Sequence, residues 1–212
     1  MCAVLFGSFI YAKNAVGFPG ESSRIMYFHV PQAWIAFLAF TLSMVFGVRY
    51  LLKRNSRDDM LAVASSELGF LFCILAMVTG SIFAHLTWGS FWNWDPRETS
   101  ILILLMIYGA NFALRSAISD VEAKRKISSV YLILAFATAP FFIFIMPRIT
   151  MSLHPSDTMN PLNPGLDTRS MLVFITAMIA FTGIFIWMLS LKFRYMQIQE
   201  KLNRIEIPWK LD

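Results

Sequence analysis

The sequence is poor in charge, cysteine and histidine. Only 15% of its 212 residues are charged, whereas soluble domains usually carry about 25% charged residues. The two cysteines, Cys2 and Cys73, lie in apolar stretches and form no CxxC pair, so neither a disulfide framework nor a zinc site is predicted. There is no CxxCH motif, which excludes a c-type cytochrome. The first twelve residues have no basic segment and no clear small-residue cleavage site, so we expect no cleavable signal peptide.

Long apolar runs take the place of charge. Hydrophobic residues make up 57% of the chain, and its mean hydropathy is +0.60. A helix needs about 20 residues to cross the hydrocarbon core of a bilayer, and several runs reach or approach that length, which predicts a polytopic membrane protein. The runs are Ala33–Leu52, Leu68–Thr87, Thr99–Leu114, Val130–Pro147, which Pro140 is expected to kink, and Met171–Leu191.

A further run, Met1–Ala12, is too short to span by itself. It gains enough length only if Lys13 snorkels to the interface and the span extends to Phe18. We therefore expect an all-α membrane protein that forms a single domain over residues 1–212. Its architecture is a bundle of six transmembrane helices, the first of which is short or truncated.

The distribution of basic residues predicts the orientation. The net charge is +5, but most of the 18 basic residues follow the second, fourth and sixth spans, which argues against nucleic acid and for a cytoplasmic location of those ends. Both termini are then cytoplasmic if the first run spans. The outer loops are residues 19–30, 88–98 and 148–169, and all three histidines lie in them or at their membrane edge.

The stretch WGSFWNWDPRETS, residues 88–100, holds three of the six tryptophans. One isolated tryptophan at this depth would indicate an interfacial aromatic belt. Trp88, Trp92 and Trp94 together instead offer several flat apolar surfaces at the bilayer edge, which suits a flat apolar ligand.

The same stretch contains the start of a helix. Asp95 is a good N-cap, Pro96 suits the first helical position, and Glu98 completes a capping-box pattern. Arg97 has no role in the cap and could pair bidentately with a carboxylate. Arg24, in the first outer loop, could serve another carboxylate.

Two histidines lie in the loops on either side of the tryptophans. His29 stands in SRIMYFHVPQAW, where Pro31 is expected to open the second helix, and His154 stands in SLHPSD. We interpret His85, near the end of the third span, as structural. Flat aromatic surfaces, two imidazoles and two arginines match the macrocycle, iron and propionates of haem. A quinol or a lipid headgroup could also occupy such a site.

These motifs resemble a known superfamily. WGSFWNWDPRETS is similar to the tryptophan-rich WWD motif of the haem-handling proteins that include the CcmC, CcmF and CcsA families. ESSRIMYFHVPQAW looks like the segment before the second helix in the CcmC family of cytochrome c maturation proteins, and the length also fits that branch.

The resemblance implies a function and a site. It implies that haem b is bound non-covalently and transiently at the periplasmic face of the bacterial inner membrane, and is presented for covalent loading onto the haem chaperone CcmE. The mitochondrial inner membrane is a less favoured location. The partners it implies are the ABC transporter subunits CcmA and CcmB and the small membrane subunit CcmD. Carried over by motif, the axial ligands of the iron would be His29 and His154. The platform would be Trp88, Trp92, Trp94 and Asp95, and the propionates would bind Arg24 and Arg97.

An alternative is a membrane redox subunit that holds a b-type haem and exchanges electrons with quinone. Such subunits usually place their histidines within helices, often in pairs across the membrane, whereas these histidines lie on one side. A purely structural or permease subunit is ranked last, because charged residues are almost absent from the predicted spans. Any enzymatic role would be at most the attachment of haem to the chaperone.

Overall fold

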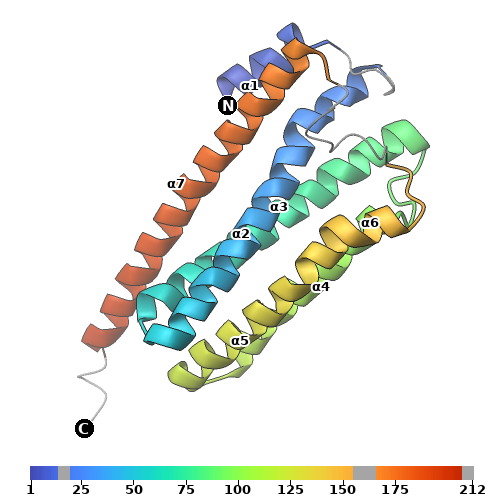
Figure 1. Ribbon diagram of the computed structural model, residues 1–212. Coiled ribbons are helices and arrows are strands. Elements are labelled where there is room, and N and C mark those ends of the chain that lie inside the picture. The colour runs from blue at the N-terminus through green and yellow to red at the C-terminus, as the bar shows by residue number, and fades with distance from the viewer. Residues whose placement is uncertain (14–19, 155–165, 207–212) are drawn as a thin grey trace.

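Apolar helices account for most of the molecule. The computed structural model describes residues 1–13, 20–154 and 166–206, and within these ranges every regular element is a helix (Figure 1). Five helical stretches are long and apolar enough to cross a membrane, which confirms the predicted all-α membrane fold. The elements are α1 (Cys2–Phe6), the π-helix η1 (Gly7–Tyr11), the 3₁₀-helix η2 (Gly20–Ile25), α2 (Met26–Lys53), α3 (Ser56–Trp88), α4 (Pro96–Ala117), α5 (Val121–Pro140), the π-helix η3 (Phe141–Ile145), α6 (Met146–Ile149) and α7 (Thr168–Glu206).

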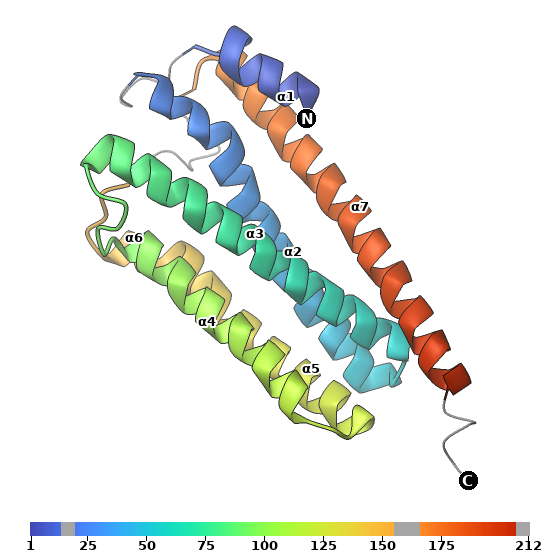
Figure 2. The same cartoon turned by 180° about the vertical axis from the view of Figure 1, so that it is seen from behind.

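The antiparallel pair α2 and α3 forms the centre of the bundle. Helices α4 and α5 pack on one side of this pair and α7 lies on the other (Figures 1 and 2). Gly69 of α3 lets the ring of Phe40 approach so closely that a Cβ at position 69 would lie 2.6 Å from it. The same ring stacks on Tyr108 of α4, with ring centroids 3.6 Å apart. One apolar core therefore joins α2, α3 and α4.

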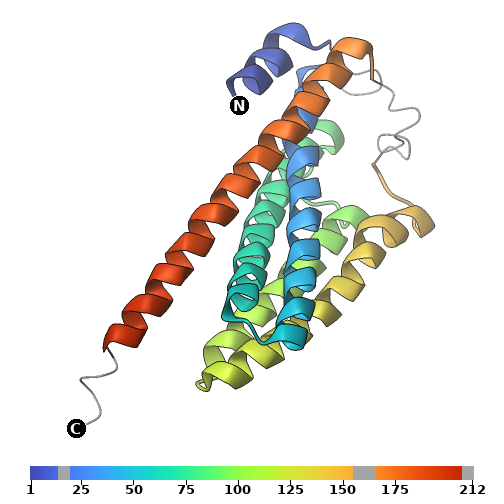
Figure 3. The same ribbon diagram turned by 60° about the vertical axis from the view of Figure 1, so that its left-hand side comes forward.

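The N-terminal helical stretch is short, as predicted. Cys2–Tyr11 has ten residues, which correspond to about 15 Å of helix, or half of the hydrocarbon core. It lies beside the start of α7 (Figure 3), where Gly7 packs against Val173. These ten residues do not cross a bilayer by themselves, so the location of the N-terminus on the cytoplasmic side stays a prediction.

One end of the bundle, which we call the basic end, collects basic residues from the C-terminal parts of α2, α4 and α7 and from the segments that join α2 to α3 and α4 to α5. Buried Asp59 of α3 forms a bidentate ion pair with Arg115, at 2.9 and 3.2 Å, and lies 3.5 Å from Arg125. Its neighbour Asp58 pairs with Arg49 at 3.1 Å. The opposite end, which carries His29, the tryptophan-rich loop and His154, we call the histidine end.

Two prolines affect the helices that contain them, one against expectation and one in agreement with it. Pro31 does not open the second helix: α2 already begins at Met26, and Pro31 is buried inside it. The prediction was wrong because η2 leads directly into α2, and the helix tolerates a proline in its second turn. The α-helical pattern of α5 does end at Pro140, where a kink was predicted, and the chain continues as the π-helix η3. π-Helical segments of this kind are frequent at functional sites.

Candidate functional site

The start of α4 organises the tryptophan-rich loop. Asp95 is the N-cap, its Oδ1 accepting from the N–H of Arg97 at 2.9 Å, and Pro96 is the first helical residue, as predicted. Glu98 differs from a regular capping box: its Oε2 accepts from the backbone N–H of Asn93 at 2.8 Å. Glu98 thereby folds the loop back over the helix start.

Asp95 also binds a distant part of the chain. Its Oδ2 accepts from the N–H of Leu153 at 2.7 Å and from the hydroxyl of Ser152 at 2.9 Å, and its Oδ1 lies 3.0 Å from Nδ1 of His154. Burial acts to raise the pKa of Asp95, but the backbone N–H groups of Arg97 and Leu153, with His154 and Ser152, hold it below the ordinary value. An ionised carboxylate therefore ties the start of α4 to the segment after α6.

The contact with Asp95 determines the state of His154. Burial, opposed by Asp95 and assisted by Arg97, places the pKa of His154 below its ordinary value. An ionised carboxylate can only accept a hydrogen bond, so Nδ1–H of the neutral ring donates to Asp95 and Nε2 keeps its lone pair. Trp88 packs edge-on against this ring with centroids 4.8 Å apart.

His29 is held in a similar way by helix α3. Its Nδ1 lies 3.1 Å from Oγ1 of Thr79, and that hydroxyl donates its hydrogen to the carbonyl of Leu75 at 2.8 Å. The remaining acceptor capacity of the hydroxyl suits Nδ1–H of His29, which again leaves Nε2 with the lone pair. Gly80 makes room for the ring, because a Cβ there would lie 2.9 Å from Cε1 of His29.

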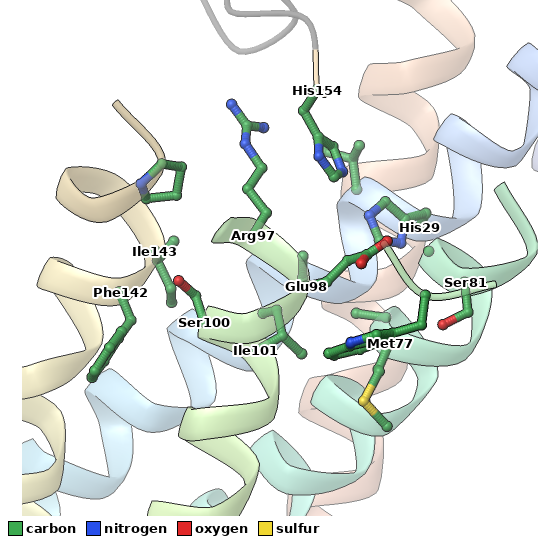
Figure 4. A pocket seen from close by; sticks show the side chains of 16 residues that line it. His29, Met77, Ser81, Arg97, Glu98, Ser100, Ile101, Phe142, Ile143 and His154 are labelled. Carbon is green, nitrogen blue, oxygen red and sulfur yellow. The ribbon is translucent and has the colours of Figure 1, made fainter. Parts of the chain in front are cut away.

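Both histidines line one pocket at the histidine end (Figure 4). The space in it that water-sized spheres can occupy is about 140 Å³, and about 860 Å³ is empty when the part open to solvent is included. The phenyl ring of Phe142 and the side chain of Ile143, from η3, lie across the pocket from His29 (Figure 4). The full lining is His29, Val30, Ala33, Ala76, Met77, Gly80, Ser81, Trp92, Arg97, Glu98, Ser100, Ile101, Phe142, Ile143, Pro147 and His154.

Arg97 and Glu98 bring incompletely paired polar atoms to this pocket. Within the described residues, buried Nε of Arg97 and buried Oε1 of Glu98 have no hydrogen-bond partner. A buried polar atom without a partner costs about 1–3 kcal/mol. The guanidinium of Arg97 is thus suited to an anionic group of a ligand.

The three tryptophans of the motif take different positions. Trp92 lines the pocket, and Trp94 packs edge-on against it with centroids 5.8 Å apart. Trp94 is 74% exposed and has a φ of 55°, so it stands at the surface. Trp88 ends α3 and supports His154. Trp92 therefore forms part of the pocket wall, Trp94 lies at the surface beside it, which we call the rim, and Trp88 supports His154.

Arg24 and His85 lie outside the pocket. The guanidinium of Arg24 pairs with Glu21 and donates to the carbonyl of Ser8, which connects η2 to the N-terminal helical stretch. His85 stacks on Phe91 with centroids 4.1 Å apart. The structure therefore brings together seven of the eight predicted site residues, in or next to the pocket, and directs Arg24 to another contact.

Sequence reasoning did not identify Thr79, Gly80 and Glu98 as parts of the site. Thr79 and Gly80 stand inside an apolar run, 50 and 51 positions from His29 in the chain, and no local pattern connects them to it. Glu98 was predicted only as a cap residue. The sequence did offer one signal for Thr79: it is a polar residue followed by a glycine within an otherwise apolar span.

The fold and the pocket define a multi-pass helical membrane protein with a two-histidine site at one end of its bundle. The family model described as "CcmC: Heme exporter protein C" matches residues 1–207. The chain belongs to this family.

Curated relatives agree with the family match. Heme exporter protein C of Bradyrhizobium diazoefficiens is 29% identical over 167 residues, covering 79% of this chain and 64% of that protein. Heme exporter protein C of Haemophilus influenzae is 28% identical over 191 residues, covering 90% and 76%. The putative cytochrome c biosynthesis ccmC-like mitochondrial protein of Marchantia polymorpha is 31% identical over 125 residues, covering 59% and 52%. The matched part thus spans less than two thirds of two of these three relatives.

Proposed function

We propose that this protein binds haem b non-covalently in the pocket at the histidine end and presents it for covalent loading onto the chaperone CcmE during the biogenesis of c-type cytochromes. The observation that carries the proposal is the pair of imidazoles on one pocket, each with its Nδ1 within hydrogen-bond distance of an oxygen acceptor. These contacts assign the ring N–H to Nδ1 and the lone pair to Nε2. Nε2 of a neutral imidazole is a common axial donor to haem iron. When bound, haem would supply the iron and the group that is transferred.

The other pocket residues fit the rest of a haem molecule. Phe142, Ile143 and Met77 provide apolar surface for a macrocycle, and Trp92 adds an aromatic wall. Arg97, whose buried Nε has no partner among the described residues, is our candidate for a propionate. Arg24 is a less suitable candidate, because its guanidinium is already bound to Glu21 and Ser8.

The open side of the pocket supports handover rather than storage. Trp94 stands exposed next to Trp92, at the rim of the pocket. A soluble chaperone could dock there and reach a ligand that is not enclosed on every side. The redox alternative fits less well, because both pocket histidines lie at one end of the bundle.

The proposed setting is the bacterial inner membrane, with the histidine end toward the periplasm and the basic end in the cytoplasm. Its support is the collection of arginines and lysines at the basic end, as the positive-inside rule requires. The proposed partners are CcmE, the transporter subunits CcmA and CcmB, and the small subunit CcmD, all of which rest on the family.

Purification in mild detergent with haem supplied tests the proposal. We expect a Soret band of six-coordinate low-spin haem, which is weakened or shifted in His29→Ala and in His154→Ala. His85→Ala is the matched control, because His85 lies at the same end but stacks on Phe91 outside the pocket. Intact protein without a Soret band would overturn the haem assignment, and unchanged spectra in both pocket variants would overturn the axial assignment.

A further inference from the structure

The two pocket histidines are held by chemically different partners. Nδ1–H of His154 donates to a carboxylate, Asp95, at 3.0 Å. Nδ1 of His29 lies 3.1 Å from a neutral hydroxyl, that of Thr79, which can accept from Nδ1–H. A carboxylate partner makes an imidazole a more basic metal ligand, and a hydroxyl does so much less.

We propose that Asp95 and Thr79 are positioning residues that make the two histidines unequal donors, with His154 the stronger and His29 the weaker ligand. The inference deepens the proposed function and depends on it, because it assigns a strength to each side of the same haem site. It also gives the aspartate of the tryptophan-rich motif a role that its position as a helix cap does not explain.

The contacts around Asp95 support a lasting charge on this carboxylate. Asp95 is 3% exposed, and its two oxygens together accept from the backbone N–H groups of Arg97 and Leu153 and from Ser152 as well as from His154. Hydrogen bonds of this kind favour the ionised form. The acceptor facing His154 is therefore a fixed anion.

The contacts around Thr79 are of another kind. Its hydroxyl lies within hydrogen-bond distance of the carbonyls of Leu75 and Ala76 and of the amide oxygen of Gln32, so it faces only neutral groups besides His29. Gly80 leaves space for the His29 ring, since a Cβ there would lie 2.9 Å from its Cε1. Thr79 can therefore orient His29 without adding negative charge to it.

The test replaces each histidine by glycine and supplies the missing imidazole from solution. In His154→Gly with haem supplied, 4-methylimidazole can both bind iron and donate N–H to Asp95, whereas 1-methylimidazole has no N–H to donate. The two molecules have the same atoms and one methyl group each. Each is titrated against the low-spin haem spectrum, and its half-saturation is normalised to that of free haem in the same detergent.

We expect 4-methylimidazole to be preferred on the order of tenfold in His154→Gly, because a hydrogen bond to a charged group is lost with the methylated isomer. In His29→Gly the preference should be on the order of threefold, as for a neutral hydroxyl acceptor. Equal or reversed preferences would overturn the inference, and so would a failure of both imidazoles to restore the His154→Gly spectrum in a protein whose wild type binds haem.

A second measurement uses the intact ligand set. Asp95→Asn should raise the midpoint potential of the bound haem, since a weaker donor stabilises ferric iron less. Ser152→Ala removes another contact of Asp95 and the acceptor of the His154 backbone N–H, but leaves the contact between Asp95 and the His154 ring. It should therefore leave the potential almost unchanged. Equal shifts in the two variants would contradict the inference. Absence of a Soret band from the wild type would instead refute the proposed function, so the two failures are distinguishable.

Discussion

Asp95 Oδ1 lies 3.0 Å from Nδ1 of His154, although the two residues are 59 positions apart in the chain. The same oxygen caps helix α4 through the N–H of Arg97. A residue that sequence reasoning assigned to a helix start is therefore also the partner of a candidate haem ligand.

Asp95→Ala should destabilise the protein more than the loss of an ordinary cap. Removal of an N-cap costs about 0.5–2 kcal/mol, and this change also strands the donors of Leu153, Ser152 and His154. Asp120→Ala is the control, because Asp120 caps α5 through Ala123 at an exposed site. Thermal unfolding in detergent measures both, and equal losses would show that the distant contacts add nothing.

Gly80→Ala should impair haem binding with little loss of fold. The new methyl group would meet Cε1 of His29 at 2.9 Å, so the imidazole must turn away from Thr79. Gly183→Ala in α7 is the control, because nothing lies within 4 Å of a Cβ there, and it should be neutral or stabilising by up to about 1 kcal/mol. Haem titration and thermal unfolding are read on both variants. Wild-type haem affinity in Gly80→Ala would contradict the placement of His29.

Arg97→Gln should weaken haem binding on the order of tenfold, as expected for the loss of a charge-assisted hydrogen bond. The low-spin spectrum should persist, because Arg97 is not an axial ligand. Arg24→Gln should leave haem affinity unchanged and instead loosen the contact between η2 and the N-terminal stretch. If Arg24→Gln weakened binding and Arg97→Gln did not, the propionate assignment would be reversed.

Trp94→Ala and Trp92→Ala should separate handover from binding. Trp94 is 74% exposed at the rim, so its loss should slow transfer of haem to purified CcmE while the Soret band of the donor remains. Trp92 lines the pocket, so its loss should lower haem affinity itself. Stopped-flow transfer and equilibrium titration distinguish the two effects. Identical behaviour of the two variants would contradict the assignment of Trp94 to handover and of Trp92 to binding.

The stability of the ligand-free protein should fall in two separate pH windows. The pKa of His154 lies below the ordinary 6.5, so the unfolded chain takes up its proton first. Stability from neutral His154 is complete above pH 6.5 and is lost as the pH falls toward the lowered value. The pKa of Asp95 lies below 3.8, so its contribution is present above pH 3.8 and is lost below it. Thermal unfolding of wild type and His154→Gln between pH 7.5 and pH 5 checks the first window, which should be absent from the variant.

Local and long-range features differ in how well the sequence predicts them. The spans follow from apolar run length, and Asp95 and Pro96 were recognised as a helix start because capping acts within a few residues. The pairs Thr79–His29 and Asp95–His154 depend on how α2, α3 and the segment after α6 pack, and no periodicity encodes that packing. For Arg24 the position in the sequence suggested a contact with a propionate of haem. Packing of the N-terminal stretch instead places the carbonyl of Ser8 next to its guanidinium.

The carboxylate of Asp95 couples the position of residues 152–154 to the hydrogen bonding of the His154 ring. Any force that pulls residues 152–154 away from α4 breaks three contacts to one side chain at once, including the one to Nδ1 of His154. A docking protein that moves this short segment would thereby weaken the hold on the cargo in the same motion that exposes it. Under the proposed function, release would then require only a movement of this segment, with no change in the bulk conditions on either side of the membrane.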